Sequence, residues 1–85
     1  MAYRIAYASQ AETARRRLPA PRRSALDKAM KSTIGTNPYG HGSVEAKPGE
    51  RDYREATVPS ADAIVVYYIS APDVLTITAV KLITF

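Results

Sequence analysis

The chain has 85 residues, no cysteine and a single histidine; 46% of its residues are hydrophobic and 24% are charged. This length suits one small domain, residues 1–85, and the balanced composition argues against a disordered or fibrous chain. Without cysteine there is no disulfide framework or thiolate metal site, and a lone histidine is too little for structural zinc, so we expect neither metal nor cofactor.

No apolar run approaches the ~18 residues that a membrane-spanning helix needs, and residues 1–10 lack the basic-then-apolar order of a signal peptide. We therefore expect a cytoplasmic protein with no membrane partner. Its charge is uneven, because residues 1–31 carry +6 and the remainder carries −2, for a net charge of +4. This excess makes an anionic partner plausible: RNA, DNA or an acidic protein segment.

The first half of the chain predicts one strand and two helices. Large side chains alternate over residues 3–7, as in a strand with one buried face. Ser9 followed by Glu12 has the spacing of a capping box, which predicts a helix over 10–18, and Pro19 ends it.

A second helix is expected from Pro21, because apolar residues then recur at three and four residue steps as far as Ile34. Gly35 follows as a helix-ending residue. Residues 36–50 are rich in glycine and proline and predict a loop, with a short strand near Val44.

The second half predicts a meander of three strands over residues 52–58, 63–70 and 74–83, which are rich in valine, isoleucine, tyrosine and threonine. The short turns between them, at 59–62 and 71–73, connect only antiparallel neighbours. The predicted fold is α+β with two layers: a helical hairpin packed on one face of a mainly antiparallel four-stranded sheet. Both helices are used on one face, so the other face is expected to stay open.

Three segments carry a family resemblance: MAYRI at residues 1–5, NPYG at 37–40 and DYR at 52–54, with the basic helical hairpin between the first two. Together they resemble the RelE/ParE toxins of bacterial type II toxin–antitoxin pairs, over nearly the whole chain. The resemblance implies a small cytoplasmic toxin held inactive by a cognate antitoxin, which when freed cuts messenger RNA in the ribosomal A site. A gyrase-poisoning branch of the same family blocks DNA replication instead. The concentrated positive charge leads us to expect an acidic, amphipathic antitoxin segment.

RNA cleavage by the adjacent 2′-hydroxyl requires a base, a cation at the phosphate and an acid for the leaving 5′-oxygen, and it needs no metal. The resemblance aligns Arg54 with a basic position of the family, so we expect it on the open surface, holding the phosphate, with Arg51 beside it. His41 is the only side chain whose ordinary pKa lies near neutrality, which makes it a candidate for proton transfer. Lys81 lies near a basic position of the family and is a candidate for phosphate binding or protonation. For each arginine, ion pairing with neighbouring acids is the alternative.

Further candidates concern RNA contacts and a second base. Tyr39, Tyr53 and Tyr68 are expected to stack on RNA bases, and Lys47 to contact RNA. Tyr67 and Tyr68 must point to opposite faces of their strand, so at most one of them is on the open surface.

Glu45 and Glu55 are other possible bases, with ion pairing as the alternative. The chain also departs from the family: Ile64 stands where active members carry an arginine, and residues 81–83 lack the expected basic cluster. Two functions therefore stay open, a ribosome-dependent endoribonuclease and a noncatalytic binder of gyrase, nucleic acid or the antitoxin alone.

Overall fold

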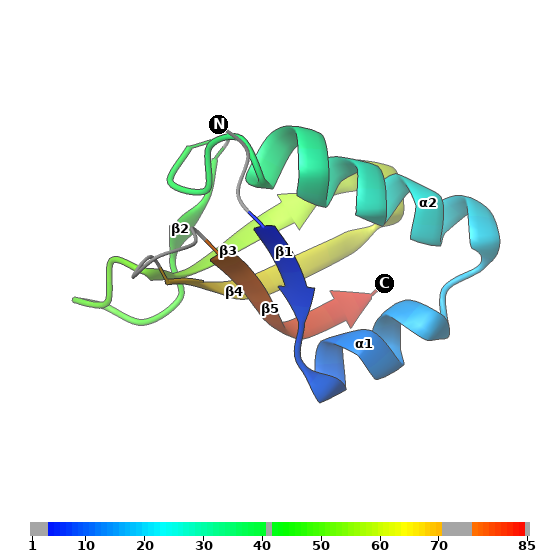
Figure 1. Ribbon diagram of the computed structural model, residues 1–85, viewed down its shortest axis with the longest axis horizontal. Helices are drawn as coiled ribbons and strands as arrows, with labels where there is room; N and C mark the ends of the chain where they lie inside the picture. Colours follow the sequence, from blue (N-terminus) through cyan, green and yellow to red (C-terminus); the bar gives the residue numbers. More distant parts are fainter. Residues whose placement is uncertain (1–3, 41, 71–75, 85) are drawn as a thin grey trace.

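A computed structural model describes residues 4–40, 42–70 and 76–84 and places two helices against a twisted sheet (Figure 1). Along the chain the elements are β1 (Arg4–Tyr7), α1 (Ser9–Arg16), α2 (Ala20–Ala29), the π-helical turn η1 (Met30–Ile34), β2 (Val44–Glu45), β3 (Tyr53–Val58), the 3-10 turn η2 (Pro59–Ala61), β4 (Ala63–Ser70) and β5 (Thr76–Thr84). The predicted turn at 71–73 and His41 lie outside the described residues.

The sheet has five strands in the order β1-β5-β4-β3-β2. β3, β4 and β5 form the predicted antiparallel meander, and β2 pairs antiparallel with β3. β1 runs parallel to β5, with Ile5 opposite Ile77. The α+β prediction is thus confirmed, with two refinements: the sheet is mixed, and the short strand near Val44 adds a fifth strand.

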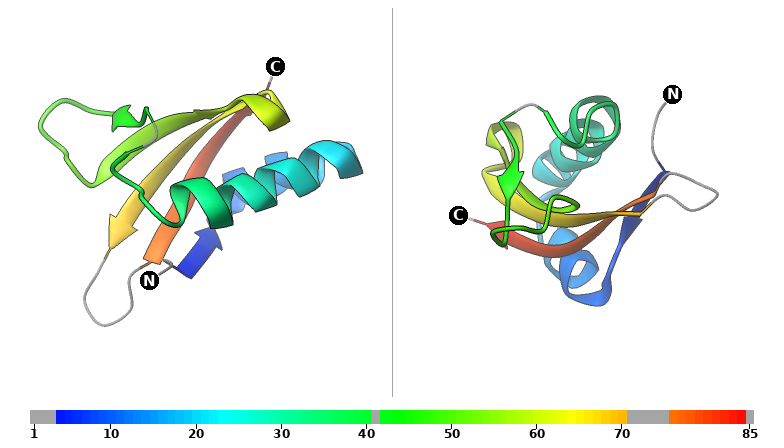
Figure 2. Two further views of the ribbon diagram at one scale, coloured as in Figure 1. Left: turned by 90° about the horizontal axis from the view of Figure 1, so that it is seen from above. Right: turned by 90° about the vertical axis from the view of Figure 1, so that its left-hand side faces the viewer.

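Both helices cover the same face of the sheet, and the core lies between the two layers (Figure 2). The strands supply alternate residues to this core, of which Tyr67 and Ile77 are fully buried. Leu26 and Met30, from α2 and its continuation η1, are fully buried against them. The apolar side chains that recur every second residue in the strands and every three to four residues in the helices therefore pack in one cluster.

The start of α1 differs from the prediction. The residue before the helix is Ala8, which makes no side-chain cap, and Ser9 is already the first helical residue. The predicted capping box is therefore wrong. Glu12 is instead held by the next turn of the helix, where it accepts hydrogen bonds from Arg15 Nη1 at 3.2 Å and Arg16 Nε at 3.0 Å. Residues three and four positions apart lie on one face of a helix. The two arginines therefore engage the Glu12 carboxylate that a capping box would have used.

Gly35 follows η1, and it is needed there for space rather than for a left-handed backbone, because its φ is −68°. A Cβ atom on Gly35 would lie 2.5 Å from the carbonyl oxygen of Met30 and 2.7 Å from that of Lys31. We expect Gly35→Ala to lower the free energy of unfolding by roughly 1–3 kcal/mol, the usual cost of overpacking. Urea unfolding measures this effect, with the exposed Ser24→Ala as control; equal stability of the two variants would show that η1 relaxes freely.

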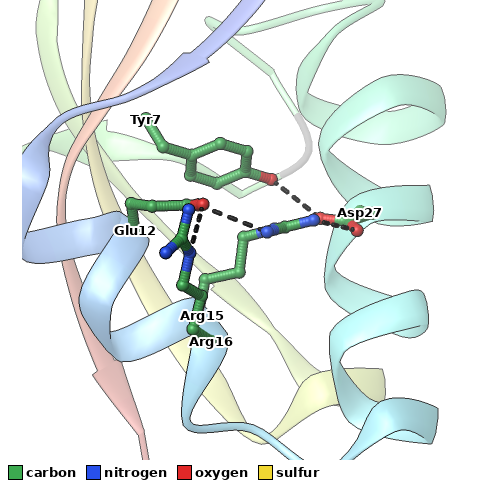
Figure 3. Close-up of polar contacts among 5 residues, drawn as sticks. All are labelled: Tyr7, Glu12, Arg15, Arg16 and Asp27. Atoms are coloured by element: carbon green, nitrogen blue, oxygen red, sulfur yellow. Dashed lines mark hydrogen bonds and ion pairs between the residues drawn. The ribbon is translucent and has the colours of Figure 1, made fainter.

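A polar cluster ties β1, α1 and α2 together (Figure 3). Arg15 donates to both carboxylate oxygens of Asp27, through Nε and Nη2, each at 2.8 Å. The Tyr7 hydroxyl donates to Asp27 Oδ1 at 3.2 Å, and the Arg15 guanidinium lies over the Tyr7 ring. Two-point pairing of this kind fixes orientation as well as distance, so the cluster sets how the helices sit relative to the first strand.

Candidate functional site

The face of the sheet opposite the helices carries no helix among the described residues, and we call it the open face. Its side chains are assigned by strand alternation and by the pairing register. On β3, β4 and β5 they include Tyr53, Glu55, Thr57, Ile64, Val66, Tyr68, Ser70, Thr78, Lys81 and Ile83. The prediction that one face stays open therefore agrees with the placement of both helices on the other side.

Residues that lie opposite one another on neighbouring strands form rows across the open face, and the first of these rows contains two aromatic residues. Tyr53 lies opposite Tyr68, and Tyr68 lies opposite Thr78. The two tyrosine rings stack with their centroids 4.9 Å apart and their planes at 28°. Tyr68 is 43% exposed, so the pair presents a flat aromatic surface to solvent. A surface of this kind can accept an unpaired base without regard to its identity.

The second row carries opposite charges. Glu55 lies opposite Val66, which in turn lies opposite Lys81, so the acid and the amine flank one small apolar residue. Adjacent strands are separated by about 4.8 Å, which puts the Cα atoms of Glu55 and Lys81 roughly 10 Å apart. Neither side chain has a hydrogen-bond or ion-pair partner within the described part of the chain. The carboxylate and the ammonium are both available to a group bound above Val66.

The third row is apolar. Thr57 lies opposite Ile64, and Ile64 lies opposite Ile83, which is 38% exposed. Ile64, which stands where the resemblance led us to expect an arginine in active members, faces the open side. This end of the open face therefore carries hydrophobic surface, as the absence of the arginine from the sequence led us to expect.

Arg54 is not on the open face, and its predicted placement there is wrong. It lies opposite Tyr67, whose side chain is buried under the helical layer, and directly opposed residues share a face. Its guanidinium donates to Ser43 Oγ and to the Ser43 carbonyl oxygen, both at 3.0 Å, and to the Arg51 carbonyl oxygen at 3.1 Å. The signal was in the sequence, because Arg54 alternates with the inward Ala56 and Val58.

The structure gathers Arg51, Arg54 and Tyr39 in a second cluster, beside the covered face. The guanidinium carbon of Arg51 lies 4.8 Å from the centre of the Tyr39 ring, and that of Arg54 lies 5.5 Å from it. The Tyr39 hydroxyl donates to Asp52. Tyr39 is thus enclosed by charged neighbours instead of presenting a free ring for stacking, whereas Arg51 remains exposed.

The two adjacent tyrosines of β4 separate as predicted. Tyr67 is fully buried, its hydroxyl donates to the Pro38 carbonyl oxygen, and burial raises its pKa. Tyr68 faces outward, and the Glu50 carboxylate, 3.4 Å from its hydroxyl, raises its pKa. Lys47 lies near the same end of the open face, because its Nζ atom pairs with the carboxylate of Glu50 at 3.7 Å and Glu50 also contacts Tyr68.

The described part of the chain has neither a metal-binding cluster nor a membrane-spanning helix. Residues 4–40, 42–70 and 76–84 contain no group of three or more histidine, cysteine, aspartate or glutamate side chains able to hold a metal ion. Within the same residues no helix has the length and apolar character required to cross a bilayer.

The order of elements, the helical pair on one face and the open face opposite define the fold of RelE toxins. A solved structure of the E. coli toxin RelE, a double arginine-to-alanine mutant in the free state, aligns with a TM-score of 0.75 at 18% sequence identity and covers 99% of this chain and 84% of that one. The archaeal RelE–RelB complex from Pyrococcus horikoshii OT3 aligns with a TM-score of 0.67 at 19% identity, covering 99% and 96%. No protein-family model and no curated protein matches the sequence.

Proposed function

We propose that the protein is the toxin of a type II toxin–antitoxin pair and that it inhibits translation by cutting messenger RNA on the ribosome. The fold supports the first part, and the archaeal neighbour was solved as a complex with its RelB partner. The observation that carries the second part is the open face, where the tyrosine stack lies one row from the unpaired Glu55 and Lys81. Rows two residues apart are about 7 Å apart along a strand, which is within reach of one nucleotide.

In the proposed reaction the base of one nucleotide stacks on Tyr68 and the scissile phosphate lies above Val66. The Glu55 carboxylate takes the proton of the 2′-hydroxyl as its oxygen attacks phosphorus. The Lys81 ammonium stabilises the charge on the phosphorane oxygens and gives a proton to the 5′-oxygen as the P–O5′ bond breaks. The products are a 2′,3′-cyclic phosphate and a 5′-hydroxyl. Lys47 contacts the RNA backbone at the rim.

In this proposal Arg51 and Arg54 have no role at the scissile phosphate. Arg54 donates three hydrogen bonds to the protein and faces the covered side. Arg51 is exposed beside Tyr39, just before the first residue of β3, and is available to contact RNA that extends beyond that end of the strand. His41 remains a candidate for proton transfer from the loop.

Primer extension on messenger RNA, with purified ribosomes and the purified toxin, tests this function directly. Discrete cuts with 5′-hydroxyl ends, detected by labelling with and without prior phosphatase treatment, are the expected result. Intact messages in the presence of active ribosomes would contradict it.

The tyrosine stack gives a separate prediction. Tyr68→Ala should weaken binding of a short oligouridylate about tenfold, because stacking on one aromatic ring contributes on that scale. Tyr68→Phe keeps the ring and should bind close to wild type. Fluorescence anisotropy of a labelled oligonucleotide measures both, and equal losses in the two variants would assign the effect to the hydroxyl and its contact with Glu50 instead of to stacking.

A noncatalytic binder is the second candidate, and the third row of the open face favours it. Ile64 and Ile83 give that surface an apolar character suited to a protein target such as gyrase. Growth arrest with intact messages and induced DNA damage would support this candidate over the ribonuclease.

A further inference from the structure

The carboxylate of Glu50 lies at the outer end of the tyrosine stack, and the proposed reaction does not use it. Its Oε1 atom is 3.4 Å from the hydroxyl oxygen of Tyr68, and its Oε2 atom is 3.7 Å from Nζ of Lys47. The hydroxyl is the tip of the Tyr68 side chain, so a flat ring that stacks on Tyr68 brings one of its edges alongside the carboxylate. Glu50 is therefore placed to contact the edge of a stacked base.

The two neighbours leave most of the hydrogen-bonding capacity of this carboxylate unused. An ionised carboxylate has about four acceptor positions, and each oxygen of Glu50 has one of these two neighbours. A hydroxyl or an ammonium group in a strong hydrogen bond lies at about 2.7–2.9 Å, so both contacts are loose. The Glu50 side chain is also 41% exposed. A donor on a bound base can reach the carboxylate without displacing a strong bond.

The turn that carries Glu50 is fixed by hydrogen bonds on both sides of this residue. The Glu50 backbone N–H donates to the Lys47 carbonyl oxygen at 3.0 Å, and the Tyr53 N–H donates to the Glu50 carbonyl oxygen at 3.1 Å. Gly49 has a φ of +85°, which glycine adopts readily, and its N–H donates to Glu45 Oε1 at 3.1 Å. The backbone of Glu50 is thus held in place before a ligand binds, which lowers the entropy cost of binding.

The neighbouring acids have other partners or positions. The Asp52 carboxylate accepts a hydrogen bond from the Tyr39 hydroxyl, and the Glu45 carboxylate accepts one from the turn itself. Glu55 lies in the second row of the open face, where the proposed reaction uses it as the base. Glu50 is the acid whose position suits contact with the stacked base.

A carboxylate accepts hydrogen bonds and donates none, so it distinguishes bases by the groups at their edges. Cytosine has an amino group where uracil has a carbonyl oxygen. The amino group can donate to Glu50, whereas the carbonyl oxygen would face the carboxylate with no proton between them. The two bases have rings of the same size and stack alike, so the difference between them arises at the carboxylate. Adenine and guanine also carry amino groups, which separates uracil from the other three bases.

We propose that Glu50 makes the tyrosine stack selective for bases that carry an amino group, so that uracil is disfavoured there. The inference rests on the proposed function in one respect, since it takes RNA to be the ligand of the open face. It adds a specificity-determining residue to that face. Lys47 has a separate role, because its ammonium group offsets the charge of Glu50 beside the RNA phosphates, and phosphate contacts carry no sequence information.

The test is fluorescence anisotropy with two short labelled RNAs of equal length, an oligocytidylate and an oligouridylate, at neutral pH and one salt concentration. The wild type should bind the oligocytidylate about tenfold more tightly, on the scale of one hydrogen bond to a charged group. Glu50→Gln should bring the two affinities within about twofold of each other, because an amide donates to uracil as well as accepting from cytosine. Equal affinities in the wild type, or a preference that Glu50→Gln leaves unchanged, would overturn the inference.

Two further variants separate specificity from affinity. Glu45→Gln removes the neighbouring charge but keeps an oxygen that can accept from the Gly49 N–H, so the preference for oligocytidylate should remain. Lys47→Met should weaken both RNAs by a similar factor and leave the ratio of their affinities within about twofold of the wild-type ratio. Loss of the preference in Lys47→Met with its retention in Glu50→Gln would assign the discrimination to the lysine and overturn the role of Glu50.

The binding assay contains no ribosome and involves no cleavage, so its outcome is independent of the primer-extension assay. Cleavage of messenger RNA together with equal binding of the two RNAs would overturn the role of Glu50 and leave the proposed ribonuclease in place. A preference that depends on Glu50, together with intact messages, would overturn the ribonuclease and leave the base recognition in place.

Discussion

Glu55→Gln and Lys81→Met are each expected to lower the rate of mRNA cleavage at least about 100-fold while leaving the fold intact. General acid–base groups and a single cation at the transition state each typically contribute factors of about 10² or more. Both residues lie on the surface of the sheet without partners among the described residues, so their replacement leaves no buried group unsatisfied. Single-turnover cleavage on programmed ribosomes measures the rates, and thermal unfolding checks the fold.

Matched controls exist for both changes. Glu45→Gln removes an acid from β2, where Glu45 lies opposite Arg54 and off the open face, and Lys28→Met removes an exposed lysine from α2. Both should cleave within about twofold of wild type, because neither lies near the proposed phosphate position. If Glu55→Gln and Lys81→Met cleave as fast as these controls, the second row of the open face has no part in the chemistry.

Asp27→Asn is expected to be the most destabilising of the polar substitutions, by roughly 2 kcal/mol, because it removes the charged partner of Arg15 in a half-buried site. A loss of this size corresponds to a fall in Tm of about 10 °C for a domain of this length. The side chains of Arg15 and Asp27 are 24% and 33% exposed, so solvent screens the pair only in part. The measurement is thermal unfolding at neutral pH, with the exposed Asp62→Asn as control.

The same cluster predicts how stability depends on pH. The hydrogen bonds from Arg15 hold the pKa of Asp27 below its ordinary value in the folded state. The folded protein therefore binds this proton less readily than the unfolded chain, whose value is about 3.9. The stabilisation is complete above that value and is lost as the pH falls through the lowered pKa of the folded state.

Urea unfolding from pH 7 to pH 2 should thus show the difference between wild type and Asp27→Asn shrinking as the pH falls below about 4. A difference that stays constant down to pH 2 would mean that the ionised carboxylate does not stabilise the fold.

Local sequence patterns predicted the elements and the split between Tyr67 and Tyr68, because a period of two determines which side chains of a strand share a face. The alternation of Arg54 with Ala56 and Val58 also indicates its correct side, whereas the family motif pointed to the opposite one. Glu55 was recognised as a possible base, yet its position in one row with Lys81 depends on the register of three strands, and register is a long-range property.

The parallel pairing of β1 with β5 was likewise beyond local reasoning, since residues far apart in the sequence meet there. The capping box failed for a different reason: Glu12 had two arginines within one helical turn, and ion pairing with them replaced the cap. The fold followed from patterning, whereas the candidate site required the register.

The pairing irregularity in β5 has a consequence for how this surface tolerates changes in chain length. Lys81 lies opposite Val66 and Ala79 opposite Tyr67, so one residue of β5, Val80, has no pairing partner. If the strand alternated strictly from Ala79, Lys81 would face the helices and Leu82 would face solvent. Because Val80 is an extra, unpaired residue, Lys81 faces solvent and Leu82 faces the helices instead. Deletion of Val80 would therefore leave a regular strand in which Lys81 still points outward and Leu82 still points to the core, so the surface can lose the extra residue without losing its amine.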